Sequence, residues 1–247
     1  MREITILGFG LVAALALTGT SAHAQTLNAT YFTLGETDPD VASAPQGTFS
    51  DWVLPDLGPN GLPVFNPSAS GFSPTDPSLK DLDSAGEITW WSPALNTNVT
   101  ETSTGTVNLP FSNPNFFPPN GTGSNDANGL QTAIFSGTLN VPTSEQITFS
   151  VGADDDAFVY LDGVNVCDLG GIHGDSPGMC TTSTIDAGDH TLELFYADIE
   201  QTGAALTFSV ETEGVTTTAT SVPEPASMAL LGGGMIGLGW LRRRKSA

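Results

Sequence analysis

Glycine, proline, serine, threonine and asparagine interrupt the chain every few residues between positions 25 and 221, so this stretch contains no convincing helix. The runs between the interruptions are short and rich in β-branched and aromatic residues, as at 30–34, 88–91, 106–109 and 132–139. About 200 residues of this kind suffice for one all-β domain. The sequence therefore predicts an all-β fold, an antiparallel, jelly-roll-like β-sandwich with long loops rich in proline and glycine.

Three consecutive aspartates, Asp154, Asp155 and Asp156, follow one of the predicted strands. Residues 147–151 alternate apolar and polar side chains, which is the pattern of a strand with one buried face. Adjacent carboxylates repel one another unless water or a cation neutralises them. Two interpretations remain open: a site for a hard cation such as calcium, or a solvated, turn-forming cluster.

A hairpin is predicted directly after the aspartates. Residues 157–161 form an apolar run, and Asp162-Gly163 is the dipeptide that supplies the two positive φ angles of a type I′ turn. We therefore expect residues 164–166 to pair back onto the preceding strand.

Two further segments are predicted to be irregular. Residues 38–80 contain eight prolines and read as long loops over the sandwich, held down by Phe49, Trp52 and Phe65. Residues 212–221 are rich in threonine and predict an extended tether with nothing to pack against.

The charge of the chain is strongly one-sided. All but two of its 27 acidic residues, Glu3 and Glu224, lie between positions 25 and 222, where Lys80 is the only base. Such a surface repels nucleic acid and anionic lipid, which need Lys and Arg contacts. It attracts divalent cations, or alternatively it only keeps an exported protein soluble.

The two ends of the chain predict export and sorting. Residues 1–24 combine Arg2, an apolar run and the sequence Ala-His-Ala before Gln25, which indicates a secretory signal peptide with a signal helix; the apolar run is short for a membrane anchor. Residues 222–247 begin with Val222, Pro223, Glu224 and Pro225, continue with 16 apolar or small residues and end in a basic tail.

This C-terminal pattern resembles the PEP-CTERM sorting signal. Its apolar part predicts a short transmembrane helix over 226–241, marginal in length for a bilayer, with the basic residues 242–245 on the cytoplasmic side. The resemblance implies that the partner of this signal is an exosortase, a membrane transpeptidase-like enzyme of bacteria that make exopolysaccharide.

Cys167 and Cys180 are the only cysteines. In an exported chain their spacing favours a disulfide over two free thiols. A zinc site that also used His173 is the weaker alternative, because the paired C-x₂₋₄-C pattern is missing.

Three segments carry a resemblance to a known domain: ADDDAFVYLDG, DLGGIHG, and AGDHTLELFYADIEQTGAALTF. They resemble the fibro-slime domain, which is akin to the protective-antigen-type β-sandwich of flocculins and bacterial adhesins. The similarity is dense over 130–211, and LNATYFTL at 27–34 is similar to how such domains begin. This implies one domain over 25–211, between the signal peptide and the predicted tether at 212–221.

The resemblance also implies a calcium site. In protective-antigen-type lectins a cis-linked pair of aspartates holds a calcium ion that coordinates sugar hydroxyls, and this pair corresponds to Asp154 and Asp155. Asp156 is a further candidate ligand, and Asp198 or Glu200 would complete the shell. The family commonly brings an asparagine and carbonyls there, whereas this chain has ADIEQTGAA.

The Gly-rich loop between the cysteines supplies candidate ligand-binding residues, namely Gly171, His173 and Asp175. His173 is expected either to line a ligand site beside the metal or to donate to a backbone carbonyl of a tight loop. His190 is expected to make a structural hydrogen bond.

Catalysis is not expected. The chain has two histidines beyond the signal peptide and no G-x-S-x-G motif, and no carboxylate pair stands out as the acid and base of a glycosidase. Trp90 and Trp91 are candidates for stacking on a sugar, although at least one should face the core.

The sequence therefore predicts an exported, exosortase-processed protein of a bacterial cell surface or extracellular matrix, anchored by its C-terminal helix at least before processing. Its predicted function is calcium-dependent, non-catalytic binding of glycan such as exopolysaccharide. The alternative is a structural matrix protein in which calcium only stabilises the fold. A polysaccharide hydrolase is the third possibility.

Overall fold

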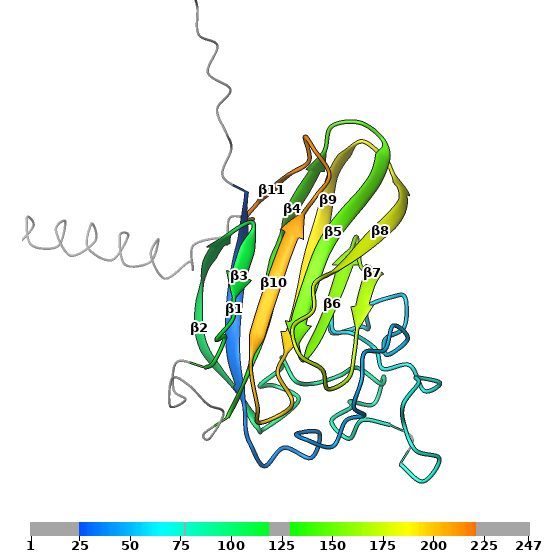
Figure 1. Cartoon of the computed structure of the whole chain (residues 1–247), viewed down its shortest axis with the longest axis vertical. Coiled ribbons are helices and arrows are strands. Elements are labelled where there is room, and N and C mark those ends of the chain that lie inside the picture. The colour runs from blue at the N-terminus through cyan, green and yellow to red at the C-terminus, as the bar shows by residue number, and fades with distance from the viewer. Residues whose placement is uncertain (1–24, 77, 119–128, 221–247) are drawn as a thin grey trace, which may run out of the picture.

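The computed structural model describes residues 25–76, 78–118 and 129–220, which form two antiparallel β-sheets packed face to face (Figure 1). The predicted signal peptide at 1–24 and the sorting segment at 222–247 lie outside the described residues. Within the described part of the chain, no helix is present that could cross a membrane.

The strands follow one another in chain order as β1 (Thr26–Leu34), β2 (Val99–Asn108), β3 (Phe111–Asn113), β4 (Leu130–Val141), β5 (Glu145–Asp154), β6 (Asp156–Leu161), β7 (Val164–Leu169), β8 (Gly178–Ile185), β9 (Gly188–Ala197), β10 (Ala205–Val210) and β11 (Thr216–Thr218). The larger sheet has the order β2-β1-β4-β9-β6-β7, with β11 added to β4, and the smaller sheet has the order β3-β10-β5-β8. The predicted all-β, antiparallel sandwich is confirmed.

The main core lies between the two sheets. Ile147, Phe149 and Val151 of β5 are completely buried, while the residues that alternate with them are partly exposed, as the period-2 pattern predicts. The ring of Phe149 stacks on that of Phe208 from β10, with 5.9 Å between their centroids. Burial of this face is the main force that holds the smaller sheet to the larger one.

A second core covers the outer face of the larger sheet. Every residue of β6 is buried, because Ala157 and Val159 face the first core while Phe158 and Tyr160 face the second. The second core is closed by residues 36–98, which we call the loop layer. In Figure 1 the blue and cyan loops lie beside β6 and β7 at the lower end of the sandwich.

Aromatic residues fix the loop layer in place. Trp52 and Phe65 are buried and Phe49 is partly buried against them, which confirms the predicted anchors. Trp90 and Trp91 are also buried, and their indole N–H groups donate to Asp40 at 3.0 Å and to the carbonyl of Tyr196 at 2.7 Å. Both tryptophans are therefore core residues and neither offers a sugar platform.

The expected strand at 88–91 is wrong: Ile88 makes only an isolated bridge to Leu82. The β-favouring residues there are selected by burial in the second core, which requires apolar side chains but no ladder of backbone hydrogen bonds.

The predicted hairpin is confirmed. Asp162 and Gly163 have φ angles of 52° and 75°, and β7 pairs back onto β6. The Asp162 carboxylate accepts hydrogen bonds from the backbone of Thr191 at 2.8 Å and pairs with His190 at 2.7 Å, so His190 has the structural role expected of it.

The prediction of an unpacked tether at 212–221 is wrong for its middle part. Thr216–Thr218 forms β11 and pairs with residues 138–140 of β4, and Val215 and Thr217 are buried. β1 pairs with β4 only as far as Ser136, so the backbone of β4 beyond that residue needs another partner. The extended, β-branched threonines supply it.

Candidate functional site

The three aspartates lie where the chain passes from one sheet to the other. Asp154 ends β5 in the smaller sheet and Asp156 begins β6 in the larger sheet. The peptide bond between Asp154 and Asp155 is cis, as the family resemblance implies. Asp155 is thus placed at one end of the sandwich, between the loops that follow β7 and β9.

Asp155 is the most firmly held of the three. It is buried, its Oδ1 accepts a hydrogen bond from the backbone N–H of His173 at 3.1 Å, and its Oδ2 accepts from Ile199 at 2.9 Å and Glu200 at 2.8 Å. Burial raises the pKa of Asp155 to about 7. The carboxylate therefore joins two loops while it keeps lone pairs for a further ligand.

Asp154 is half-buried beside it. Its backbone carbonyl accepts a hydrogen bond from the Tyr196 hydroxyl at 2.6 Å, and burial raises the pKa of its carboxyl group. Gly203 has a φ of +103°, and a side chain there would bring its Cβ to 2.5 Å from Asp154 Oδ2. The glycine in the sequence QTGAA therefore makes room for the Asp154 carboxylate.

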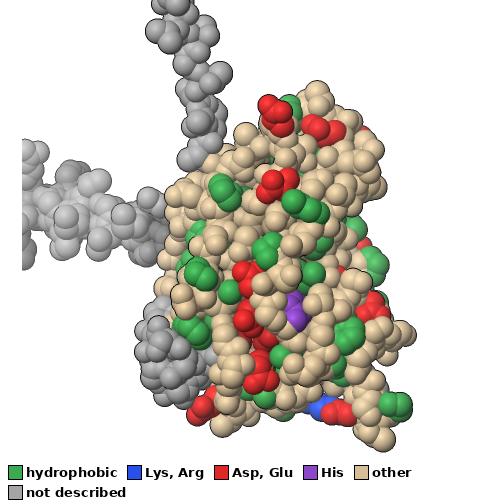
Figure 2. Space-filling model, viewed as in Figure 1, with side chains coloured by type: hydrophobic (Ala, Val, Ile, Leu, Met, Phe, Trp, Pro, Cys, Tyr) green, Lys and Arg blue, Asp and Glu red, His purple; other side chains and the backbone are tan. Residues whose placement is uncertain are grey.

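A cavity of about 260 Å³ opens over this pair. Its lining contains four of the predicted site residues together with four others: Asp154, Asp155, His173 and Glu200, and Gln46, Ile172, Gly174 and Thr202. Figure 2 shows acidic side chains gathered beside a histidine on the face viewed there. Among the described residues, three carboxylates and no Lys or Arg line the cavity, apart from any contribution of other segments, and this lining favours a cation.

His173 stands at the edge of the cavity. Its backbone N–H donates to Asp155, and its Nδ1 lies 3.2 Å from the carbonyl oxygen of Gly174. Its Nε2 is enclosed and has no hydrogen-bond partner among the described residues. Both expectations for His173 therefore remain compatible with its position, since the residue lines the cavity while its Nδ1 faces the loop backbone.

Asp156 lies below the cavity and is not part of its lining. It is completely buried, its Oδ1 accepts a hydrogen bond from the Gly171 backbone at 2.8 Å, and its Oδ2 has no hydrogen-bond partner in the described segments. Burial, with the charge of Asp155 next, raises its pKa well above the ordinary value. Gly171, at φ +100°, approaches Gly47 so closely that a Cβ would meet its carbonyl oxygen at 2.4 Å.

The other predicted residues are distributed around the cavity. Glu200 lines it, whereas Asp198 is completely buried and lies outside the lining, with its backbone N–H donating to Gln131 at 2.9 Å. Asp175 is exposed and accepts a hydrogen bond from the Thr207 hydroxyl of β10 at 3.3 Å. Of the two candidates for completing a metal shell, Glu200 is the one at the cavity.

The predicted disulfide is present and joins the two sheets. Cys167 belongs to β7 at the edge of the larger sheet and Cys180 to β8 at the edge of the smaller one, with 5.6 Å between their Cα atoms. The loop between them carries His173, so the bridge restrains one wall of the cavity.

A second acidic group escaped the sequence reasoning. Asp38, Asp40 and Asp81 each offer a carboxylate oxygen, and these oxygens lie within 4.8 Å of one another. The Asp-Pro-Asp sequence at 38–40 was a faint signal, but Asp81 is 41 residues beyond Asp40 and only the fold of the loop layer brings it there.

Comparison with known families gives two matches in sequence. The sequence profile of the PA14 domain matches residues 119–222. The profile of the PEP-CTERM protein-sorting motif matches residues 221–245, so the predicted sorting signal at Val222, Pro223, Glu224 and Pro225 is confirmed as a sequence motif. No curated protein sequence matches the chain.

Solved PA14 domains are among the similar structures. The PA14 domain of the antifreeze protein MpAFP is 12% identical, with 84% of this chain and 99% of that chain covered and a TM-score of 0.37. A PA14 sugar-binding domain from an RTX adhesin is 18% identical, with coverages of 79% and 96% and a TM-score of 0.36.

An anti-sigma factor domain-containing protein is 13% identical over 51% of this chain, with a TM-score of 0.38. The chain spans only 44% of that protein and 11% of a β-glucosidase from Kluyveromyces marxianus that is also similar.

Proposed function

We propose that this chain is an exported surface or matrix protein that binds glycan without catalysis, through a calcium ion held at Asp154 and Asp155. The observation that carries the proposal is the Asp155 carboxylate. It is fixed by three backbone N–H groups at the floor of an open cavity, with the carboxylates of Asp154 and Glu200 in the same lining.

The donor set of the cavity suits calcium. Calcium takes six to eight oxygen ligands from carboxylates, carbonyls, hydroxyls and water. Asp154, Asp155 and Glu200 supply carboxylates, and Gln46 and Thr202 add an amide and a hydroxyl at the rim. Because the cavity is open, part of the coordination shell faces solvent, and vicinal hydroxyls of a sugar replace the water there.

The size and lining of the cavity favour a single terminal sugar unit. The remaining polar groups of the lining provide hydrogen bonds that orient the ring. The RTX adhesin domain is described as sugar-binding, and the epithelial adhesin 9 A domain of Candida glabrata, also similar in structure, was solved with Galb1-4GlcNAc. Both descriptions agree with the proposed ligand class.

The site is proposed to be non-catalytic because glycoside hydrolysis needs an acid and a second carboxylate on opposite sides of the bond. The pair here comes from consecutive residues at one crossing between the two sheets.

The PEP-CTERM motif supports a proposal for how the protein is exported and where it is located. We propose that residues 1–24 direct export, that an exosortase recognises the signal at 222–247, and that the binding domain extends to about residue 220, because β11 belongs to the sandwich. The domain then faces the extracellular matrix of a bacterium.

A structural matrix role is the second candidate. In the described part of the chain, no Trp, Tyr or Phe lines the cavity, so those segments provide no aromatic sugar platform there. In that case calcium would stabilise the domain, and other surfaces would contact matrix proteins.

A glycan array separates these two functions. The full chain is screened with calcium and with excess chelator, beside Asp155→Asn, Glu200→Gln and the matched control Asp186→Asn. Asp186 is exposed and directly follows β8, whose last residue pairs with Glu145 at the opposite end of β5 from Asp154. We expect binding that is lost with chelator and in both site variants and kept in the control. A blank array in calcium, with the chain correctly folded, would favour the matrix role.

A further inference from the structure

A second buried acidic group lies in the loop layer, outside the cavity described above. Asp38 and Asp40 are 4% and 0% exposed, and together with Asp81 they bring three carboxylate oxygens within 4.8 Å of one another. None of the three lines the Asp154 cavity. Burying several like charges is costly unless they are neutralised.

The hydrogen bonds of Asp40 and Asp38 orient their carboxylates. Asp40 accepts from the backbone N–H groups of Lys80 at 2.6 Å and Asp81 at 3.0 Å and from the Trp90 indole. Asp38 accepts from the backbone of Asp40 at 3.0 Å and from the amides of Asn96 at 3.2 Å and Asn98 at 3.3 Å. All of these donors are uncharged, so they fix the geometry and leave the negative charge in place.

Asp81 supplies the independent observation. Its Oδ2 exposes less than 1 Å² to solvent and has no hydrogen-bond partner in the described part of the chain. An enclosed carboxylate oxygen with no partner is rare in native proteins and indicates a group that something else satisfies.

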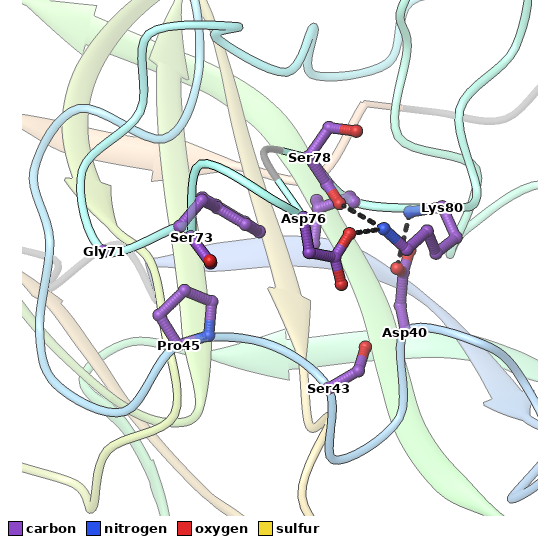
Figure 3. Close-up of a pocket in the computed structure, with 10 residues that line it drawn as sticks. Asp40, Ser43, Pro45, Gly71, Ser73, Asp76, Ser78 and Lys80 are labelled. Atoms are coloured by element: carbon purple, nitrogen blue, oxygen red, sulfur yellow. Dashed lines mark hydrogen bonds and ion pairs between the residues drawn. The ribbon is translucent and has the colours of Figure 1, made fainter.

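The nearest base does not provide the missing charge. Lys80 is the only Lys or Arg among the described residues, and its ammonium group bonds Asp76 and the carbonyl of Ser78. Figure 3 shows this ammonium beside Asp76, while only the backbone N–H of Lys80 reaches the Asp40 carboxylate. The cluster therefore has no counter-charge from the protein among these residues.

We infer that Asp38, Asp40 and Asp81 form a second divalent-cation site, separate from the glycan site, which holds the loop layer together. An ion about 2.4 Å from each ligand can be shared by oxygens up to about 4.8 Å apart. The three oxygens here lie within that distance of one another. Carboxylate oxygens select hard cations such as calcium, magnesium or manganese.

One of the three carboxylate residues borders a cavity. Asp40 lines a cavity of about 190 Å³ whose other polar or charged lining residues are Ser43, Ser73, Asp76, Ser78 and Lys80 (Figure 3). The ion would connect segments that are distant in sequence, namely 38–40 and 81, and Asn96 and Asn98 would orient its ligands. Its role is structural, because two of its three ligands, Asp38 and Asp40, are buried.

Counting bound ions tests the inference directly. The purified full chain is stripped with EDTA and titrated with calcium by isothermal calorimetry, with bound metal counted by mass spectrometry. The variants are Asp81→Asn, which keeps the side-chain shape, Asp155→Asn at the proposed glycan site, and the control Glu36→Gln. Glu36 is exposed and lies two residues before Asp38, so this control removes the same charge from the same segment.

We expect two bound ions in the wild type and the control, and one in each site variant. Two ions in Asp81→Asn, or one ion in the wild type that disappears with Asp155→Asn, would overturn the second site. If Asp81→Asn does not fold, Asp155→Asn decides: one retained ion supports the site, and none overturns it. A single wild-type ion that is lost only in Asp81→Asn would confirm this site and contradict the calcium ion of the proposed function.

Discussion

The two acidic groups of this molecule both consist of aspartates, but one group opens onto a cavity and the other is largely enclosed. Asp154 and Asp155 are neighbours in sequence and open onto a cavity of about 260 Å³, and the Asp155 carboxylate receives three backbone N–H groups. Asp81 joins Asp38 and Asp40 from a distant loop, and its Oδ2 is enclosed without a hydrogen-bond partner among the described residues.

This difference in exposure indicates that the two acidic groups have different functions. A cation at an open, rigidly supported pair keeps coordination positions for a ligand, whereas a cation enclosed by three side chains can only stabilise. We therefore assign recognition to the first group and stability of the loop layer to the second, and changes at each should have separable effects.

The largest separation is expected in ligand binding. Asp155→Ala removes a carboxylate from the cavity floor, and we expect glycan affinity to fall by more than about 100-fold, equivalent to about 2.7 kcal/mol. Asp81→Ala should change affinity by less than about threefold. Surface plasmon resonance on a glycan found by the array measures both, and equal losses in the two variants would break the distinction.

Of the two acidic groups, only Asp154 and Asp155 should be affected by removal of the disulfide. Replacing Cys167 and Cys180 by Ala should lower the free energy of unfolding by about 3 kcal/mol, because the bridge closes a loop between the two sheets. The His173 wall of the cavity loosens with it, so glycan affinity falls several-fold while the ion count at Asp81 stays unchanged. Urea denaturation and the calcium titration check the two halves of this expectation.

The order of stability of the wild type and Asp81→Asn should differ between chelator and calcium. Without metal, Asp81→Asn removes an enclosed, unsatisfied carboxylate and should be more stable than the wild type by about 1–3 kcal/mol. In excess calcium the order should invert, because only the wild type gains the binding free energy of the ion. Thermal denaturation of both proteins in EDTA and in calcium shows whether the curves cross; if their order does not change, the second site is not a metal site.

The metal-free protein should also lose stability as the pH rises. Burial raises the pKa of Asp155 and Asp168 to about 7 and that of Asp81 to about 8, far above the value of about 4 in an unfolded chain. Between these values the folded state binds more protons than the unfolded state, so the free energy of unfolding falls as the pH increases.

In EDTA we expect the loss to be at least about 2 kcal/mol between pH 5 and pH 8. Calcium should flatten the curve because the ion replaces the protons on Asp155 and Asp81, while Asp168 keeps its dependence. A metal-free midpoint that rises over this range would contradict the burial of these carboxylates.

Local sequence patterns predicted most of the sandwich. The alternation at 147–151, the Asp162-Gly163 turn, the disulfide and the position of the aspartate pair all depend on residues close in sequence or on a family motif, and all are present in the structure. The prediction of an unpacked tether was wrong because its threonines pair with backbone of β4 that lacks another partner. No local sequence pattern reveals this pairing.

The loop layer was predictable only in outline. Its aromatic anchors could be identified from hydrophobicity, but the strand expected at 88–91 is absent, since burial and strand formation favour the same residue types. The Asp38, Asp40 and Asp81 group depends on how two loops fold together, so neither spacing nor composition could locate it.

The central claim is that a cation lies at the aspartate pair. Anomalous diffraction from crystals of the full chain grown with calcium tests it most directly. We expect a peak within bonding distance, about 2.4 Å, of carboxylate oxygens from Asp154 and Asp155, at the floor of the cavity that Glu200 lines. If crystals grown in saturating calcium show no anomalous peak at that position, the claim is contradicted.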